Sequence, residues 1–215
     1  MRTNSEIRAV AREALGKSIF SSAWLGAIGA YLLTSLIVGL TSYLCIGFIL
    51  MLPMIAGLTC YFLRLIRTGK TEIGEIFAGF RERRFWRSIG LYLLMSFYLF
   101  FWSFIPFALL IKPYSYRMAF YLMVEYPELS LNACITESRR MMNGYKWQAF
   151  CMDFSFIGWY LLGYLACGVG ALFVVPYQVT SNALFYAVLK DAYVLSEAER
   201  EADATLTEMQ MNNKK

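Results

Sequence analysis

The sequence predicts an all-α integral membrane protein with about six transmembrane helices, arranged as three hairpins with amphipathic connector helices on the cytoplasmic side. Three observations predict this class. Hydrophobic residues make up 59% of the 215 residues and charged residues only 16%, whereas a soluble domain carries about 25% charged residues. No charged residue lies between Lys17 and Arg64, and one spanning helix needs only about 20 apolar residues. The basic residues gather at the ends of such uncharged stretches, where membrane topology uses them.

Residues 1–17 are predicted to form a short amphipathic helix. Apolar residues recur at helical spacing from Ile7 to Leu15, with charged residues on the other face. Thr3 and Glu6 have the spacing of a capping box, which marks the start of a helix. Such a helix is expected to lie on the membrane surface, and an ordinary solvated helix is the alternative.

The polytopic membrane domain is predicted to cover residues 18–190. It divides into helical hairpins at about 18–67, 86–126 and 147–190, and its six spans are expected at about 18–41, 46–66, 86–109, 113–126, 147–168 and 176–189. Pro53, Pro113 and Pro176 recur about 60 residues apart, which suggests three copies of one hairpin unit. Each proline is expected near the start of a hairpin's second helix, because the first helical turn tolerates proline.

Two polar segments connect the hairpins, and a charged tail follows the last one. Residues 71–87 and residues 129–146 are expected to form amphipathic connector helices, and residues 191–215 are expected to extend the last helix. Of the 20 lysine and arginine residues, all but Lys112 and Arg117 fall in the N-terminal segment, the connectors, their flanks or the tail. The positive-inside rule therefore places both termini and both connectors in the cytoplasm, with three short turns outside.

The residue types argue against an enzyme. The chain has no histidine, which excludes Ser-His and Cys-His catalysis and the usual zinc ligands. No phosphate-binding loop, dinucleotide fingerprint or metalloprotease motif is present. We therefore expect no catalytic residues, no metal site and no cofactor.

The lipid bilayer is the expected partner. The net charge of +5 is concentrated beside the spans, which argues against nucleic acid as a partner. The basic connectors have the composition of anionic-lipid sites, although topology signalling explains them equally well. Protein partners are not indicated by any motif.

Asp153 is one of two ionisable residues predicted inside the spans. Tyr160 and Tyr164 share its helix face. An intramembrane charge is costly, so Asp153 is expected to point into the helix bundle and find a partner. Its carboxylate either fastens helices together or forms a polar site for a ligand or proton, and we favour the first interpretation.

Arg117 is the second such residue, and Tyr121 and Glu125 share its face. If the fourth span is one helix, Arg117 lies near its outer end, whereas Asp153 lies nearer the inner side. This difference in depth argues against a direct contact, and snorkelling of Arg117 towards the outer headgroups is expected. A tilted or re-entrant fourth segment would bring the two residues closer.

Several segments carry a family resemblance. The stretches "FLRLIRTGK", "DFSFIGW" and "VVPY" resemble the bacterial integral-membrane family of domain of unknown function 975, and the resemblance covers nearly the whole chain. It implies a multi-spanning helical protein of the bacterial cytoplasmic membrane with no established activity. The chain has "IPFALL" where the family commonly has "IPGII", and Arg117 replaces a small polar residue.

Two functions are compatible with these observations. A non-enzymatic component that serves in membrane assembly, ligand binding or envelope stress is the first. A transporter or permease subunit is the alternative, with a substrate path at the hairpin-repeat interface, because interrupted helices at corresponding positions are typical of transporters.

Overall fold

The computed structural model of the chain describes residues 3–15, 21–42, 47–70, 72–165 and 169–212. Within these ranges the chain is helical and contains no strand, so the all-α class is confirmed. The elements are α1 (Asn4–Leu15), α2 (Ser22–Ser42), α3 (Gly47–Thr68), the 3₁₀ helix η1 (Ile73–Phe80), α4 (Glu82–Trp102), α5 (Pro106–Tyr116), α6 (Ala119–Glu125), α7 (Leu131–Met141), α8 (Lys146–Leu165) and α9 (Val169–Asn212). The outer turn predicted between the first two spans lies mostly outside the described residues, whereas the turn predicted between the fifth and sixth spans falls in the first turns of α9.

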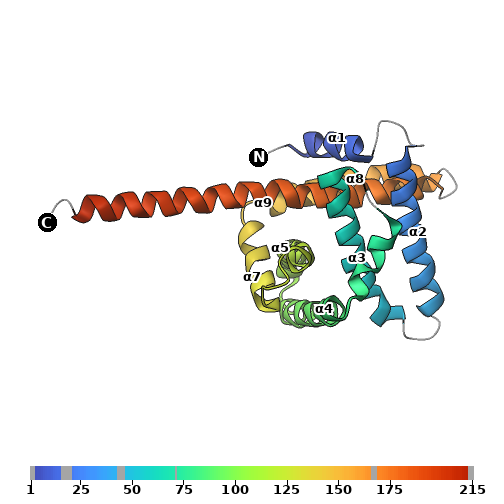
Figure 1. Cartoon of the computed structure of the whole chain (residues 1–215), viewed down its shortest axis with the longest axis horizontal. Coiled ribbons are helices and arrows are strands. Elements are labelled where there is room, and N and C mark those ends of the chain that lie inside the picture. Colours follow the sequence, from blue (N-terminus) through green and yellow to red (C-terminus); the bar gives the residue numbers. More distant parts are fainter. Residues whose placement is uncertain (1–2, 16–20, 43–46, 71, 166–168, 213–215) are drawn as a thin grey trace.

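Helix α9 organises the fold (Figure 1). It crosses the domain as one long helix, and α1, α3 and α8 all pack against it. Helices α2 and α3 lie side by side with η1 against them, while α4, α5 and α7 lie on the other side of α3. The C-terminal part of α9 projects beyond the rest of the domain, so the charged tail extends the last helix as predicted.

Four of the described helices are long and apolar enough to cross a membrane. The stretches concerned are Ser22–Gly39, Leu50–Thr68, Glu82–Trp102 and Leu172–Ala198. These are the first, second, third and sixth predicted spans. The first three lie close to their expected boundaries, whereas the sixth begins before and ends well after the expected 176–189. The complete arrangement of six spans in three hairpins stays a prediction.

The fourth predicted span is not one helix. It is divided into α5, with 11 residues, and α6, with 7 residues, and the chain turns between them at Arg117 and Met118. Ser138 of α7 satisfies the backbone at this break: its hydroxyl accepts from the Met118 amide (3.2 Å) and donates to the Ser115 carbonyl (2.8 Å). A buried helix break needs such partners for its free backbone groups.

The three prolines lie inside helices. Pro53 follows the first turn of α3, Pro113 lies in the second half of α5, and Pro176 is preceded by two turns of α9. The expectations that the fourth span begins near Pro113 and the sixth at Pro176 are therefore wrong, because α5 already begins at Pro106 and the apolar residues before Pro176 already continue α9.

The N-terminal helix forms as predicted, but its apolar face meets protein. The capping box is present, with the Thr3 amide donating to Glu6 Oε2 at 2.8 Å. Ile7, Ala11 and Leu15 are fully buried, and α1 packs mainly on α9. The face that the amphipathic pattern assigned to the membrane surface is thus part of the core.

The first connector also differs from its prediction as an amphipathic surface helix. It forms η1, whose backbone touches that of α3: a Cβ on Gly57 would lie 1.7 Å from the Ile76 carbonyl oxygen, and one on Gly79 would lie 1.8 Å from the Pro53 carbonyl oxygen. Gly57 of α3 faces η1, and Gly79 of η1 faces α3. The absence of a side chain at both positions permits this close approach, and Ile76 is fully buried. The second connector contains the expected helix, α7.

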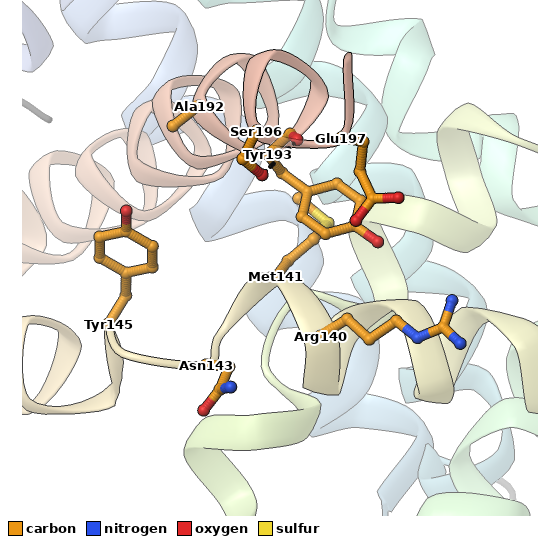
Figure 2. Close-up of a pocket in the computed structure, with 8 residues that line it drawn as sticks. All are labelled: Arg140, Met141, Asn143, Tyr145, Ala192, Tyr193, Ser196 and Glu197. Carbon is orange, nitrogen blue, oxygen red and sulfur yellow. Dashed lines mark hydrogen bonds between the residues drawn. The ribbon is translucent and has the colours of Figure 1, made fainter. Parts of the chain in front are cut away.

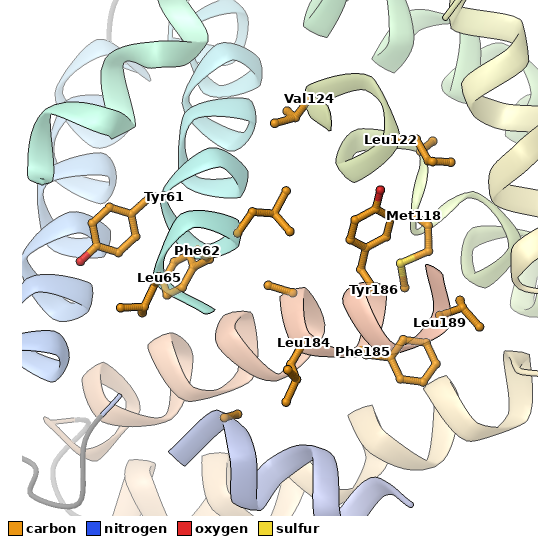
Figure 3. Packing of buried hydrophobic residues seen from close by; sticks show 14 of the residues in the cluster. Tyr61, Phe62, Leu65, Met118, Leu122, Val124, Leu184, Phe185, Tyr186 and Leu189 are labelled. Carbon is orange, nitrogen blue, oxygen red and sulfur yellow. The ribbon is translucent and has the colours of Figure 1, made fainter. Parts of the chain in front are cut away.

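The hydrophobic core lies where α3, α6 and α9 meet (Figure 3). Phe62 and Leu65 project from α3, and Phe185 and Tyr186 project from α9; all four are almost completely buried. By contrast, α4 and α8 turn large apolar side chains outward. The exposed residues include Leu93, Phe97, Phe100 and Phe101 on α4 and Phe154, Ile157, Leu161 and Leu165 on α8. Exposed apolar surface of this extent is expected for a membrane protein.

Candidate functional site

The break between α5 and α6 places Arg117 directly opposite Asp153 of α8. The guanidinium donates two hydrogen bonds to the carboxylate, from Nη1 to Oδ2 at 2.6 Å and from Nη2 to Oδ1 at 2.8 Å. The side chains retain 16% and 29% of their exposure. A bidentate pair of this geometry is among the stronger charge-assisted interactions in proteins.

A third helix completes this site. Asn182 of α9 accepts from Arg117 Nη2 at 2.6 Å, and the Tyr114 ring lies 5.8 Å from the guanidinium carbon. We call Arg117, Asp153 and Asn182 the arginine triad. The triad joins the α5–α6 break, α8 and α9 through one guanidinium.

The expected separation of Arg117 and Asp153 is wrong. It assumed a continuous fourth span with Arg117 near its outer end, whereas the chain turns at Arg117. The side chain of Arg117 faces the protein, where it bonds to Asp153 and Asn182, so the predicted snorkelling to the headgroups is wrong as well.

The two tyrosines predicted on the Asp153 face have different surroundings. The Tyr160 hydroxyl donates to Gln178 Oε1 of α9 at 2.5 Å. Tyr164 is 71% exposed. Tyr160 therefore forms a second polar link between α8 and α9, and Tyr164 does not take part.

Glu125 and Tyr121 belong to another cluster. The Glu125 carboxylate accepts from the Tyr186 hydroxyl (2.6 Å) and Arg67 Nη2 (2.7 Å), and it also pairs with Lys190. Tyr121 stacks on Tyr186 with ring centroids 5.0 Å apart. Both residues thus contact α9 rather than Arg117.

The electrostatics of Glu125 reflect these partners. Arg67 and Lys190 compensate the negative charge of the carboxylate, and the Tyr186 hydroxyl donates a further hydrogen bond to it. The carboxylate is therefore the charged acceptor that joins α3, α6 and α9.

The residues of α9 that make these polar contacts lie four positions apart in the sequence. Gln178, Asn182, Tyr186 and Lys190 form a polar stripe along one face of the helix, and they bond respectively to Tyr160, Arg117 and, for the last two, Glu125. Gln178 and Asn182 are uncharged, so the charge pattern of the sequence does not indicate them. Polar residues at four-residue spacing within an apolar run are the signal that would have indicated them.

One surface pocket lies away from these polar clusters. An open pocket of about 580 Å³ lies where α9 leaves the domain beside α7 (Figure 2). It is lined by Arg140, Met141, Asn143, Tyr145, Ala192, Tyr193, Ser196 and Glu197. Glu137 anchors two of these residues, accepting from Arg140 Nη1 and from the Tyr193 hydroxyl at 2.9 Å each. None of the residues predicted from sequence lines this pocket.

The described residues contain no group of three or more histidine, cysteine, aspartate or glutamate side chains that could hold a metal ion. Within the arginine triad the charges neutralise each other, and each member has a hydrogen-bonding partner. The arrangement is suited to holding three helical segments in fixed positions, which is a known use of intramembrane polar residues.

Comparison with known proteins gives one match. The family model described as "Protein of unknown function (DUF975)" matches residues 1–113 and residues 105–193. A search of curated proteins and a search of solved structures each gave no match. Since the two matched stretches together cover most of the chain, the protein belongs to the DUF975 family.

Proposed function

We propose that the protein is a non-enzymatic, multi-spanning component of the bacterial cytoplasmic membrane, with both termini in the cytoplasm, that serves in membrane assembly, ligand binding or envelope stress. The observation that carries this proposal is the arginine triad. A catalytic or transport mechanism inside the spans would need charged residues, and Arg117 and Asp153 are the two predicted there. They bind each other in a bidentate pair, which favours a structural role for both charges.

Two further observations support the membrane arrangement. The 20 residues of α8 would extend about 30 Å at 1.5 Å per residue, and its exposed face is apolar, which favours it as a fifth span. The distribution of lysine and arginine favours cytoplasmic termini.

This orientation is tested by fusing to the C-terminus a fluorescent protein that folds only in the cytoplasm. A fusion that is present at a normal level but does not fluoresce contradicts the orientation.

The role of Asp153 is tested by the Asp153→Asn variant in the full chain. We expect both the steady-state protein level and the unfolding temperature in detergent to fall, because Arg117 then lacks its counter-charge. Asp191→Asn, at an exposed position of α9, is the matched control and should change neither. If Asp153→Asn leaves both quantities unchanged but abolishes a resistance or transport phenotype, the structural role is refuted.

A transporter is the second candidate, and the break between α5 and α6 favours it. Discontinuous helices are typical of transporter binding sites, and the charged residue Arg117 lies at this discontinuity. Proton flux into proteoliposomes with an entrapped pH dye separates the two candidates. Flux above that of empty vesicles, lost in Asp153→Asn, would support the transporter.

A further inference from the structure

A second polar region lies at the C-terminal end of α3. An open pocket of about 450 Å³ is bordered there by α3, the end of α6, η1 and the start of α4. The charged residues that line it are Arg64, Arg67, Arg81, Arg84, Glu75 and Glu125. We call it the arginine pocket.

Two of the four arginines have carboxylate partners. Arg64 pairs with Glu75, and Arg67 Nη2 lies 2.7 Å from Glu125 Oε1. In each pair the two charges neutralise one another, and the pairs hold η1 and α6 in position against α3. Glu125 is also neutralised by Lys190, so it offers little attraction to a further cation.

Arg81 and Arg84 have no carboxylate partner within the described part of the chain. Arg84 is half-buried, and its Nη1 lies 3.4 Å from the Cys60 sulfur, which is a weak acceptor. Two guanidinium groups therefore line the pocket with hydrogen-bond donors and positive charge that the protein itself does not compensate.

The pocket is positioned at the end of two candidate spans. The apolar stretch Leu50–Thr68 ends beside it, and the stretch Glu82–Trp102 begins there. Trp86 and Phe77 are 66% and 47% exposed on the adjoining turns of α4 and η1. Exposed aromatic side chains at the ends of spans are typical of the headgroup region of a bilayer.

We propose that the arginine pocket binds a phosphate group through Arg81 and Arg84, and that the phosphate is that of an anionic lipid headgroup. Guanidinium groups match phosphate oxygens in planar, two-bond geometry, which an ammonium group does not provide. An anionic headgroup supplies both the acceptors and the negative charge that the two arginines lack, at the depth where headgroups lie. This inference rests on the membrane location in the proposed function.

The site is tested with the full chain, purified and delipidated in detergent, by its unfolding temperature during titration with phosphatidylglycerol. A ligand that binds the folded state raises this temperature. We expect stabilisation by phosphatidylglycerol and none by phosphatidylcholine. In Arg81→Gln/Arg84→Gln, the lipid concentration for half-maximal stabilisation should rise about tenfold or more, since each basic residue contributes appreciably to anionic-lipid binding.

Arg83→Gln/Arg139→Gln is the matched control, because it removes the same charge at exposed positions outside the pocket. It should leave the lipid titration unchanged. If both double variants weaken binding equally, or neither does, the arginine pocket is refuted as the site. Should Arg81→Gln/Arg84→Gln fail to fold, Arg81→Lys/Arg84→Lys keeps the charge and removes the planar donors, and wild-type affinity in it would also refute the proposal.

A parallel titration with a water-soluble phosphate identifies the source of the phosphate group. Glycerol phosphate carries the headgroup chemistry without acyl chains, and we expect it to stabilise the protein far less than the lipid does. Equal stabilisation by glycerol phosphate would support the phosphate site and overturn the lipid as its source. Extraction of the protein from cell membranes without detergent would instead refute the membrane location, so failure of the proposed function is distinguishable from failure of the site.

Discussion

Arg117 and Asp153 form a bidentate ion pair across 36 positions of the sequence, with N–O distances of 2.6 and 2.8 Å. Removing one partner of a fully buried ion pair costs about 3–5 kcal/mol. Since these two side chains are 16% and 29% exposed, we expect Arg117→Met and Asp153→Leu each to lower the free energy of unfolding by somewhat less than that amount.

The double variant Arg117→Met/Asp153→Leu should be more stable than either single variant, because no unpaired charge remains. A double-mutant cycle based on unfolding in detergent measures this coupling. Additive losses in the double variant would show that the two side chains stabilise the fold independently.

Ser138 is expected to be critical for the break between α5 and α6. Its hydroxyl is fully buried and bonds to both the Met118 amide and the Ser115 carbonyl. Ser138→Ala leaves these backbone groups unsatisfied and should cost about 1–3 kcal/mol of unfolding free energy. Ser181→Ala is the control, since Ser181 is equally buried but bonds within its own helix, to the Tyr177 carbonyl. Equal losses in the two variants would contradict this role.

The elements that the sequence predicted well are those determined by local composition. Helices α2, α3 and α4 lie close to their expected ranges because each requires only a long apolar run with charges at its ends. The capping box at Thr3 is also predictable from the sequence, since it involves residues three positions apart.

The elements that the sequence predicted poorly depend on contacts between distant residues. The break at Arg117 is stabilised by Ser138, and nothing near Arg117 in the sequence indicates that partner. Asp153 was recognised because a charge in an apolar run is conspicuous, whereas Asn182 was overlooked because an amide there is not. Which side chains bond to one another depends on the folded chain, so the sequence indicates the charged residues but not their partners.

The glycine contact between α3 and η1 gives a third prediction. A methyl group on Gly57 would overlap the Ile76 carbonyl oxygen, so Gly57→Ala must separate the two elements and should cost about 3 kcal/mol or more. Gly158→Ala is the control: Gly158 lies in α8 with nothing within 4 Å of the added carbon. That variant should be neutral or up to about 1 kcal/mol more stable, because alanine favours helix. Similar unfolding temperatures for the two variants would refute the close contact.

Glu125 gives a prediction about charge. Its carboxylate pairs with Arg67 of α3 and Lys190 of α9 and accepts from the Tyr186 hydroxyl. Glu125→Gln therefore leaves two neighbouring cations without their counter-charge.

We therefore expect the unfolding temperature of the wild type to exceed that of Glu125→Gln, which keeps the shape of the side chain and removes its charge. Thermal unfolding of both proteins in one detergent measures this difference. Equal unfolding temperatures would mean that the charge of Glu125 does not stabilise the junction of α3, α6 and α9, and that its contacts act through shape alone.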